Sequence, residues 1–306
     1  MHYHTVFCET TLYRHIAEKP GEGLSRLFLF SRTAVLPAAG RHIMEFFPPL
    51  CYNACSKQKE AAAVAIENGV WIMRGLDWDN PYRIRSWQEL IRWIDEVGFL
   101  PLFKNEIDGF SAEEHTSDLY WWSGDVEQDP WEWRELIARS GQVAYGKFFG
   151  KKAGFISRAW FPHFANWRRR GYDFDSRWDE ELASMRQKRI MDQFAVKDEL
   201  YSFELKHLAG FGKEGEKNFE GTVTDLQMSG YLLIRDFRRR VNKKGLPYGW
   251  PIAVYATPES LWGYAHISSA YTAETEQSRE LIYQQVGKNF PAATEAALQA
   301  VLGWDR

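Results

Sequence analysis

Residues 215–258 read GEKNFEGTVTDLQMSGYLLIRDFRRRVNKKGLPYGWPIAVYATP, and the order of patterns in this stretch decides the expected fold. Apolar spacing predicts a helix over 218–229 that ends at Gly230. YLLIRDF then predicts a strand, NKKG a turn with a basic tip, and WPIAVYATP a returning strand. A shorter helix is expected just before them, within residues 198–210. Helix, helix, strand, basic loop and strand is the order of a winged helix-turn-helix.

One long helix is expected in front of this unit, over residues 176–194. Its apolar residues recur at helical spacing and are expected to face a core: Trp178, Leu182, Met185, Ile190 and Phe194. This helix would serve as the first helix of the module.

A similar helix-and-hairpin unit is expected upstream. SWQELIRWIDEVGF, residues 86–99, begins with Ser86 and Glu89 in the spacing of a capping box. QVAYGKFFGKKAGFIS, residues 142–157, predicts a β-hairpin with a lysine-rich tip. We therefore expect an α+β fold made of tandem winged helix-turn-helix modules with flanking helices.

The expected divisions of the chain are 71–175 for the first module, 176–270 for the second and 271–306 for C-terminal helices that pack on the body. Residues 1–70 are set apart because all three cysteines lie there, whereas all 14 tryptophans lie later. We expect that segment to be an extension of uncertain order, with Met73 as the natural start of the folded part. Deleting it is expected to leave the melting temperature nearly unchanged.

Composition restricts the class of protein. With 306 residues, 45% of them hydrophobic, the chain can bury a sizeable core. Its net charge of −3 argues against a protein that is basic over its whole surface, so contact with nucleic acid would need local patches. The sequence shows neither a membrane-spanning run nor a typical signal peptide, and a cytoplasmic location with no membrane partner is expected. It predicts no oligomeric state.

No metal site and no cofactor are expected. Cys51 and Cys55 are four residues apart with His42 nearby, but no second pair of Cys or His follows at ligand spacing. The motifs GxGxxG, GxxxxGK[ST], HExxH and GxSxG are all missing from the sequence.

The predicted second hairpin favours DNA, and duplex DNA in particular, as the partner. Between Ile234 and Tyr248 the sequence has six basic residues and one acid, a local charge of +5. The candidates for phosphate contact are Arg238, Arg239, Arg240, Lys243 and Lys244. The alternative is a charged hairpin edge that prevents aggregation. Thr222 is expected to point outward from the preceding helix and to contact DNA, although Glu220 and Asp225 beside it would repel phosphates.

A second basic cluster, expected to help bind DNA, consists of Arg168, Arg169 and Arg170, with Arg158 upstream. Aromatic residues interleave with it and could stack on unpaired bases: Trp160, Phe161, Phe164 and Trp167. The alternative is that these rings are simply core. Trp160 and His163 are candidate pocket residues.

The stretch WWSGDVEQDPWEWR, residues 121–134, combines tryptophans with acids. Because apolar surroundings raise the pKa of a carboxyl group, an acid here could act as a general acid or base. Asp125 is the catalytic candidate, with Trp121 and Trp122 lining the pocket on a loop. The alternative reading is structural, with Asp129 as the N-cap of a helix that starts at Pro130.

The strings quoted above, at residues 86–99, 121–134, 142–157 and 215–240, resemble the AlkZ-related proteins of bacteria. The resemblance covers about residues 84–285, with DPWEWR and AYGKFF as its most distinctive strings. It implies a fold of tandem winged helices and a nucleic-acid context, because the family looks related to the AlkZ-type DNA glycosylases that excise damaged bases. Those glycosylases position water with a Gln-x-Gln or Gln-x-Asp motif. This sequence has neither, so no catalytic residue is carried over.

Three functions are therefore weighed. The first is a winged-helix protein that binds DNA, in a repair context. The second is a DNA glycosylase with a non-standard catalytic centre. The third is a winged helix that binds a protein or a small ligand, which an acidic face on the helix at 218–229 would suit.

Overall fold

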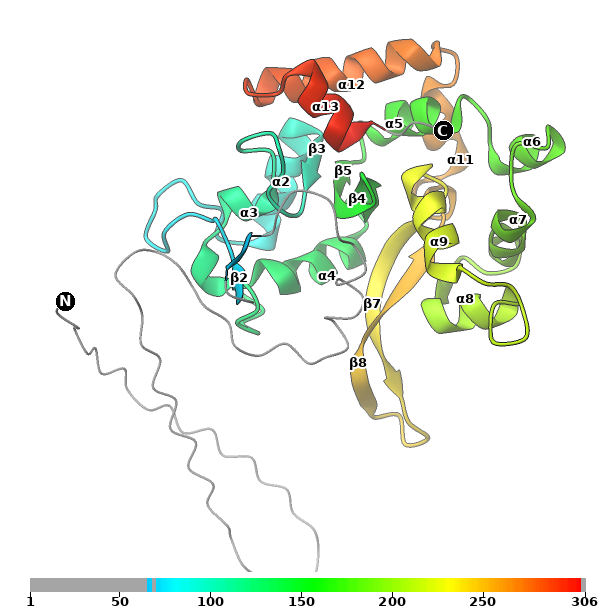
Figure 1. The fold of residues 1–306 in the computed structure, drawn as a ribbon. Coiled ribbons are helices and arrows are strands. Elements are labelled where there is room, and N and C mark those ends of the chain that lie inside the picture. Colours follow the sequence, from blue (N-terminus) through cyan, green and yellow to red (C-terminus); the bar gives the residue numbers. More distant parts are fainter. Residues whose placement is uncertain (1–64, 68–69, 304–306) are drawn as a thin grey trace, which may run out of the picture.

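The computed structural model describes residues 65–67 and 70–303. Expectations for Cys8, Cys51 and Cys55, and for the order of the N-terminal extension, lie outside the described residues. The described chain is a mixed α+β structure, in which helices accompany two small antiparallel three-stranded sheets (Figure 1). A two-stranded hairpin, β1 (Ala65–Glu67) with β2 (Val70–Ile72), precedes them.

The first sheet has the strand order β3-β5-β4. The elements of this half are α2 (Trp87–Val97), β3 (Phe99–Pro101), α3 (Ala112–His115), α4 (Pro130–Ser140), β4 (Val143–Phe149) and β5 (Lys152–Ser157). The expected hairpin at 142–157 is confirmed. The edge strand β3 was not expected, because three residues after a helix are too few to show an alternating pattern.

The second sheet repeats this order as β6-β8-β7. The elements of this half are α6 (Phe174–Asp179), α7 (Met185–Met191), β6 (Glu199–Tyr201), α8 (Ser202–Leu208), α9 (Phe219–Met228), β7 (Leu233–Val241) and β8 (Pro247–Ala256). In each half the strand that comes first in the sequence pairs with the last one. The remaining helices are α5 (Phe161–Arg169), α10 (Pro258–Trp262), α11 (Tyr264–Ile267), α12 (Thr275–Asn289) and α13 (Glu295–Leu302).

Helix ends follow the capping signals in the sequence. The Ser86 hydroxyl accepts a hydrogen bond from the Glu89 N–H at 3.2 Å, and α2 stops at Gly98, whose φ of 85° suits glycine. The face of α2 that the sequence marked as apolar packs into the core through Leu90, Ile91, Ile94 and Val97. Asp129 caps α4 and Gly141 ends it in the left-handed conformation, as expected.

The single long helix expected over 176–194 is wrong. A turn separates α6 from α7, and within it Glu181 takes a left-handed φ of 57°. Ser184 then starts α7 with a capping box, in which its hydroxyl accepts from the Gln187 N–H. Of the five residues expected in the core only Ile190 is fully buried, while two are exposed, Leu182 and Met185.

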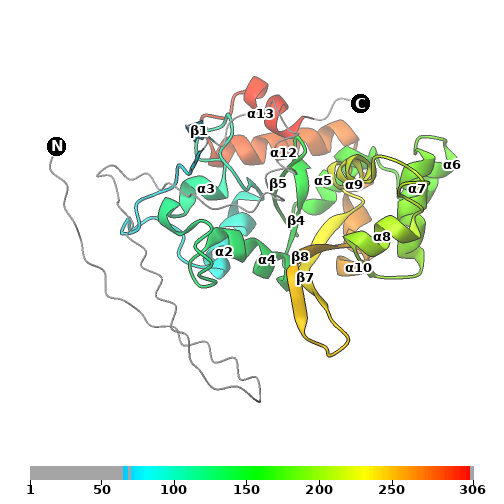
Figure 2. The same cartoon turned by 60° about the horizontal axis from the view of Figure 1, so that its bottom comes forward.

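The two halves pack on each other in a reciprocal way. Helix α4 of the first half lies against β7 of the second, and helix α9 of the second lies against β4 of the first. The side-chain oxygen of Gln227 on α9 accepts the Lys147 N–H of β4 at 3.0 Å. Buried side chains from both halves form one continuous core. Helices α12 and α13 pack on α5 and β4, away from the tip of the β7–β8 hairpin (Figures 1 and 2).

Candidate nucleic-acid interface

The β7–β8 hairpin projects from the body of the molecule, as both views show (Figures 1 and 2). Its two strands pair from Leu233 with Ala256 to Val241 with Pro247. The part near the core is buried, whereas residues 239–250 are all exposed. The exposed basic side chains of this distal part are Arg239, Arg240, Lys243 and Lys244. The hairpin therefore presents a cluster of positive charge to solvent.

Two other basic residues of the hairpin serve internal packing. The guanidinium of Arg235 donates to the Ala138 carbonyl at 2.9 Å and so satisfies the end of α4. Arg238 forms ion pairs with Asp236 and with Glu199 on β6. The charge available to a ligand is therefore smaller than the +5 read from the sequence. Arg238, an expected DNA contact, is thus tied to β6, the strand on the far side of β8.

A groove of about 380 Å³ lies between α4 and the β7–β8 hairpin. Its lining combines acids with arginines and includes Glu132, Glu135, Arg139, Asp236 and Arg238. Burial raises the pKa of Glu135, an effect that its hydrogen-bond partner Arg134 opposes. Asp236 accepts hydrogen bonds from Arg139 at 2.9 Å and Arg238 at 2.6 Å.

Arg134, the residue before Glu135, is held between two aromatic rings. The Arg134 guanidinium carbon lies 3.7 Å from the ring centre of Trp131 and 4.3 Å from that of Phe237. Trp131 and Arg134 come from α4, whereas Phe237 comes from β7, so the stack joins the two halves. Sequence reasoning missed Glu135, Asp236 and this stack, because only the packing of α4 on β7 brings them together.

The expectation that Thr222 points outward is wrong. Its side chain is 5% exposed, and its hydroxyl donates to the Asn218 carbonyl at 2.9 Å. Ser229 is buried as well, and Glu220 is exposed at the start of α9. The helix is covered because it packs on β4, a contact between halves that its own sequence does not reveal.

Two of the three arginines at 168–170 are interior residues. Arg169 is fully buried, pairs with Glu259 and donates to the Gly230 carbonyl at 2.6 Å. Arg168 is 5% exposed, donates to the Leu302 carbonyl and has a pKa lowered by burial to about 9. Neither guanidinium faces solvent, which corrects the expected role of both as phosphate contacts. Arg170 is exposed and ends α5 with a left-handed φ of 56°.

The aromatic candidates do not form one pocket. Trp121 is 2% exposed and its indole N–H donates to the Thr116 hydroxyl at 3.0 Å, so the expectation that it meets a ligand from a free loop is wrong. Trp122 beside it is half-buried. Trp160 and His163 lie elsewhere, where the imidazole Nδ1 is 3.2 Å from the Ser278 hydroxyl on α12 and burial lowers its pKa.

The rings expected to stack on bases are also largely interior. Phe161 and Phe164 on α5 have no exposed surface, and Trp160 and Trp167 pack against the core. Their helical spacing therefore reflects burial.

Two acids of WWSGDVEQDPWEWR, Asp125 and Asp129, differ in burial. Asp125 is exposed, and its carboxylate accepts the Glu127 N–H at 3.0 Å in a local turn. Asp129 is fully buried and accepts from the N–H groups of Trp122, Gly124 and Trp131 at 3.0, 2.9 and 2.8 Å. Burial raises the pKa of Asp129, the acid that caps α4.

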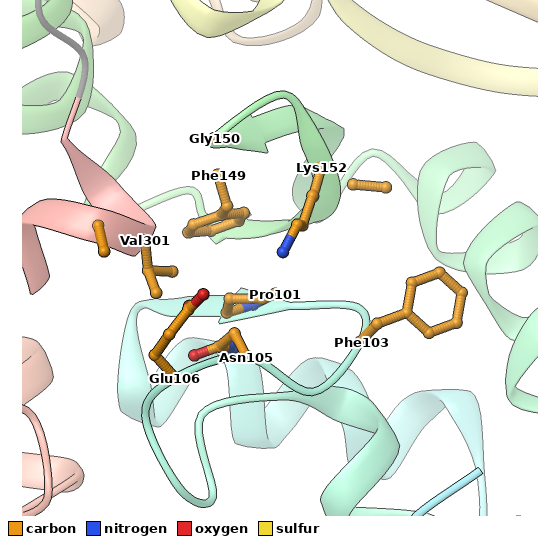
Figure 3. Close-up of a pocket in the computed structure, with 10 residues that line it drawn as sticks. Pro101, Phe103, Asn105, Glu106, Phe149, Gly150, Lys152 and Val301 are labelled. Atoms are coloured by element: carbon orange, nitrogen blue, oxygen red, sulfur yellow. The ribbon is translucent and has the colours of Figure 1, made fainter. Parts of the chain in front are cut away.

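A smaller cavity lies between the β4–β5 tip and α13 (Figure 3). Lys152 points into it toward Glu106 and Pro101, and burial lowers the pKa of the lysine. Its volume of about 60 Å³ is far below the roughly 300 Å³ of the smallest usual ligand pockets. A nucleobase does not fit there.

Within the described residues, no group of three His, Cys, Asp or Glu side chains is arranged to hold a metal ion. No helix in the described part of the chain is long and apolar enough to cross a membrane.

The family model described as AlkZ related matches residues 84–303. The chain belongs to the AlkZ-related family. No curated protein and no solved structure matches it. The AlkZ-related match starts just before α2 and ends after α13, so it includes both three-stranded sheets and the groove between α4 and the β7–β8 hairpin.

Proposed function

We propose that this AlkZ-related protein binds duplex DNA, and that it consists of two winged helix-turn-helix modules corresponding to residues 71–175 and 176–270. From α2 to β5 and again from α7 to β8, the α-helices and strands follow the order helix, strand, helix, helix, strand, strand. In each sheet the last strand lies between the other two. Both features are those of a winged helix, in which the final two strands form the wing.

The observation that carries DNA binding is the exposed charge on the second wing. Arg239, Lys243 and Lys244 are exposed, and none of them takes part in an ion pair with another described residue. Such side chains bind phosphates and release condensed counterions. Membership of the AlkZ-related family agrees with a nucleic-acid partner.

Binding by this hairpin has little dependence on DNA sequence. A helix that reads bases must enter the major groove with exposed side chains. Helix α9 is mostly buried against β4, and α4 is held against β7. The wing therefore supplies affinity by binding phosphates, whereas α4 and α9 serve to join the two modules.

The test is a titration of labelled duplexes of unrelated sequence, followed by fluorescence anisotropy at several salt concentrations. The expected result is similar affinity for every sequence and a steep loss of affinity as salt increases. The absence of duplex binding at low salt would contradict the proposal.

Base excision is a second candidate function, favoured by one observation. The groove beside the wing contains Glu135, a largely buried carboxyl group with a raised pKa, as a general acid or base requires. Asp125, the candidate from sequence, lies outside this groove and is exposed. A glycosylase assay on duplexes that carry damaged bases tests this function.

A further inference from the structure

The distal half of the β7–β8 hairpin exposes apolar side chains among its basic ones. The exposed fractions are 63% for Val241, 58% for Leu246, 49% for Tyr248 and 66% for Trp250. In the described part of the chain most other large hydrophobic side chains are buried or half-buried, so a cluster of exposed ones on a projecting hairpin indicates a binding surface.

The register between β7 and β8 shifts in the segment that contains Trp250. Arg240 pairs with Tyr248 and Arg238 pairs with Ile252, so three residues of β8 lie opposite Arg239 alone. Gly249 starts this bulge with a φ of 73°, a conformation that favours glycine. Bulges bend a strand and redirect its side chains. The bulge therefore places Trp250, whose side chain is exposed, in the segment of β8 opposite Arg239.

The two exposed rings are not engaged by the rest of the protein. Among the residues that the structure describes, neither Tyr248 nor Trp250 stacks on another ring or under a cation. Arg240, in contrast, lies with its guanidinium carbon 4.4 Å from the Phe203 ring centre on α8. The faces of both rings are therefore available to a ligand.

We propose that Tyr248 and Trp250 stack on unpaired bases, so that the preferred ligand is duplex DNA with an unpaired region. This proposal rests on the proposed DNA-binding function. Aromatic rings stack on bases of any sequence when those bases are not held in a duplex, and nearby cations bind the backbone. The hairpin combines both groups, since Trp250 and Tyr248 lie between Pro251 and the charged tip at Lys243 and Lys244.

The test compares a fully paired duplex with the same duplex carrying a short central bubble of mismatched bases. Stacking of one base changes affinity by roughly 5- to 150-fold. We expect the wild type to bind the bubble at least about tenfold more tightly than the paired duplex. Trp250→Ala should abolish most of this preference and leave affinity for the paired duplex unchanged. Trp250→Phe should keep part of it.

Trp78→Ala is the matched control, because Trp78 is an exposed tryptophan, at 59%, outside the hairpin. Equal affinity of the wild type for both DNAs would overturn the stacking proposal and leave the duplex-binding function intact. Failure to bind either DNA would reject both. Binding to anionic lipid vesicles is measured as well. If Trp250→Ala weakened vesicle binding and the wild type showed no preference for the bubble, the hairpin surface would serve a membrane and the proposal would be overturned.

Discussion

Arg139 Nε donates a hydrogen bond to Asp236 Oδ1 at 2.9 Å, although 97 positions separate the two residues in the sequence. The pair joins α4 of the first half to β7 of the second, and Asp236 is 4% exposed. Arg238 pairs with the other oxygen of the same carboxylate. One buried acid thus holds both the neighbouring helix and the base of the projecting hairpin.

Asp236→Ala is expected to destabilise the protein by about 2 kcal/mol, because it leaves two half-exposed arginines without their buried partner. Urea unfolding measures this free energy. Glu214→Ala, at an exposed acid, is the control and should leave stability nearly unchanged. Equal midpoints for the two variants would show that Asp236 does not fix the hairpin.

The cap of α4 yields a prediction that separates two nearby acids. From the sequence, loss of the Asp129 cap should cost about 1 kcal/mol. Because the buried carboxylate accepts three backbone N–H groups, Asp129→Ala is now expected to cost about 2 kcal/mol. Asp125→Asn should barely change the melting temperature, since that side chain is exposed. Thermal melting of both variants is the measurement. Similar losses of stability in the two variants would refute the assignment of Asp129 as the cap and of Asp125 as a surface residue.

The pKa of Glu135 predicts how stability depends on pH. Burial raises its pKa in the folded state above the unfolded value, so the folded state binds the proton more tightly. The resulting penalty is absent below the ordinary Glu pKa of about 4.3 and complete above the folded pKa. Glu135→Gln should therefore raise the melting temperature at pH 7, and this gain should shrink as the pH falls toward 4. A gain that is independent of pH would exclude this cause.

Base excision, if the protein performs it, should depend on the groove. Glu135→Gln should then abolish excision of damaged bases, whereas Asp125→Asn should retain it because Asp125 does not line the groove. Single-turnover assays on both variants provide the measurement, with thermal melting as the check on folding. Loss of excision only in Asp125→Asn would instead restore the candidate chosen from the sequence.

Local signals predicted local structure well. Ser86 and Asp129 begin helices and Gly141 ends one, as their capping chemistry predicts, and the hairpin at 142–157 forms as its pattern indicates. The break between α6 and α7 was missed because apolar residues recur at helical spacing across it, although Ser184 and Gln187 have capping-box spacing. That signal could have located the break.

The site was harder to predict because contacts between halves build it. Arg168, Arg169 and Thr222 have the residue types of a phosphate-binding surface, yet packing of α5 and α9 buries them. Sequence periodicity shows which face of a helix is apolar, but it does not show that a neighbouring hairpin covers the polar face. The basic tip of the second hairpin was predictable, because a projecting turn has no neighbour to bury it.

The most direct measurement of the central claim is the salt dependence of duplex binding by the triple variant Arg239→Ala, Lys243→Ala, Lys244→Ala. Its control replaces three exposed lysines outside the hairpin with alanine, namely Lys197, Lys213 and Lys288, and so changes the net charge equally. The hairpin variant should bind every duplex more weakly, and the slope of log affinity against log salt should fall in magnitude by about 3. The control should keep the wild-type slope. An unchanged slope and affinity in the hairpin variant would contradict the assignment of this hairpin as the DNA-binding wing.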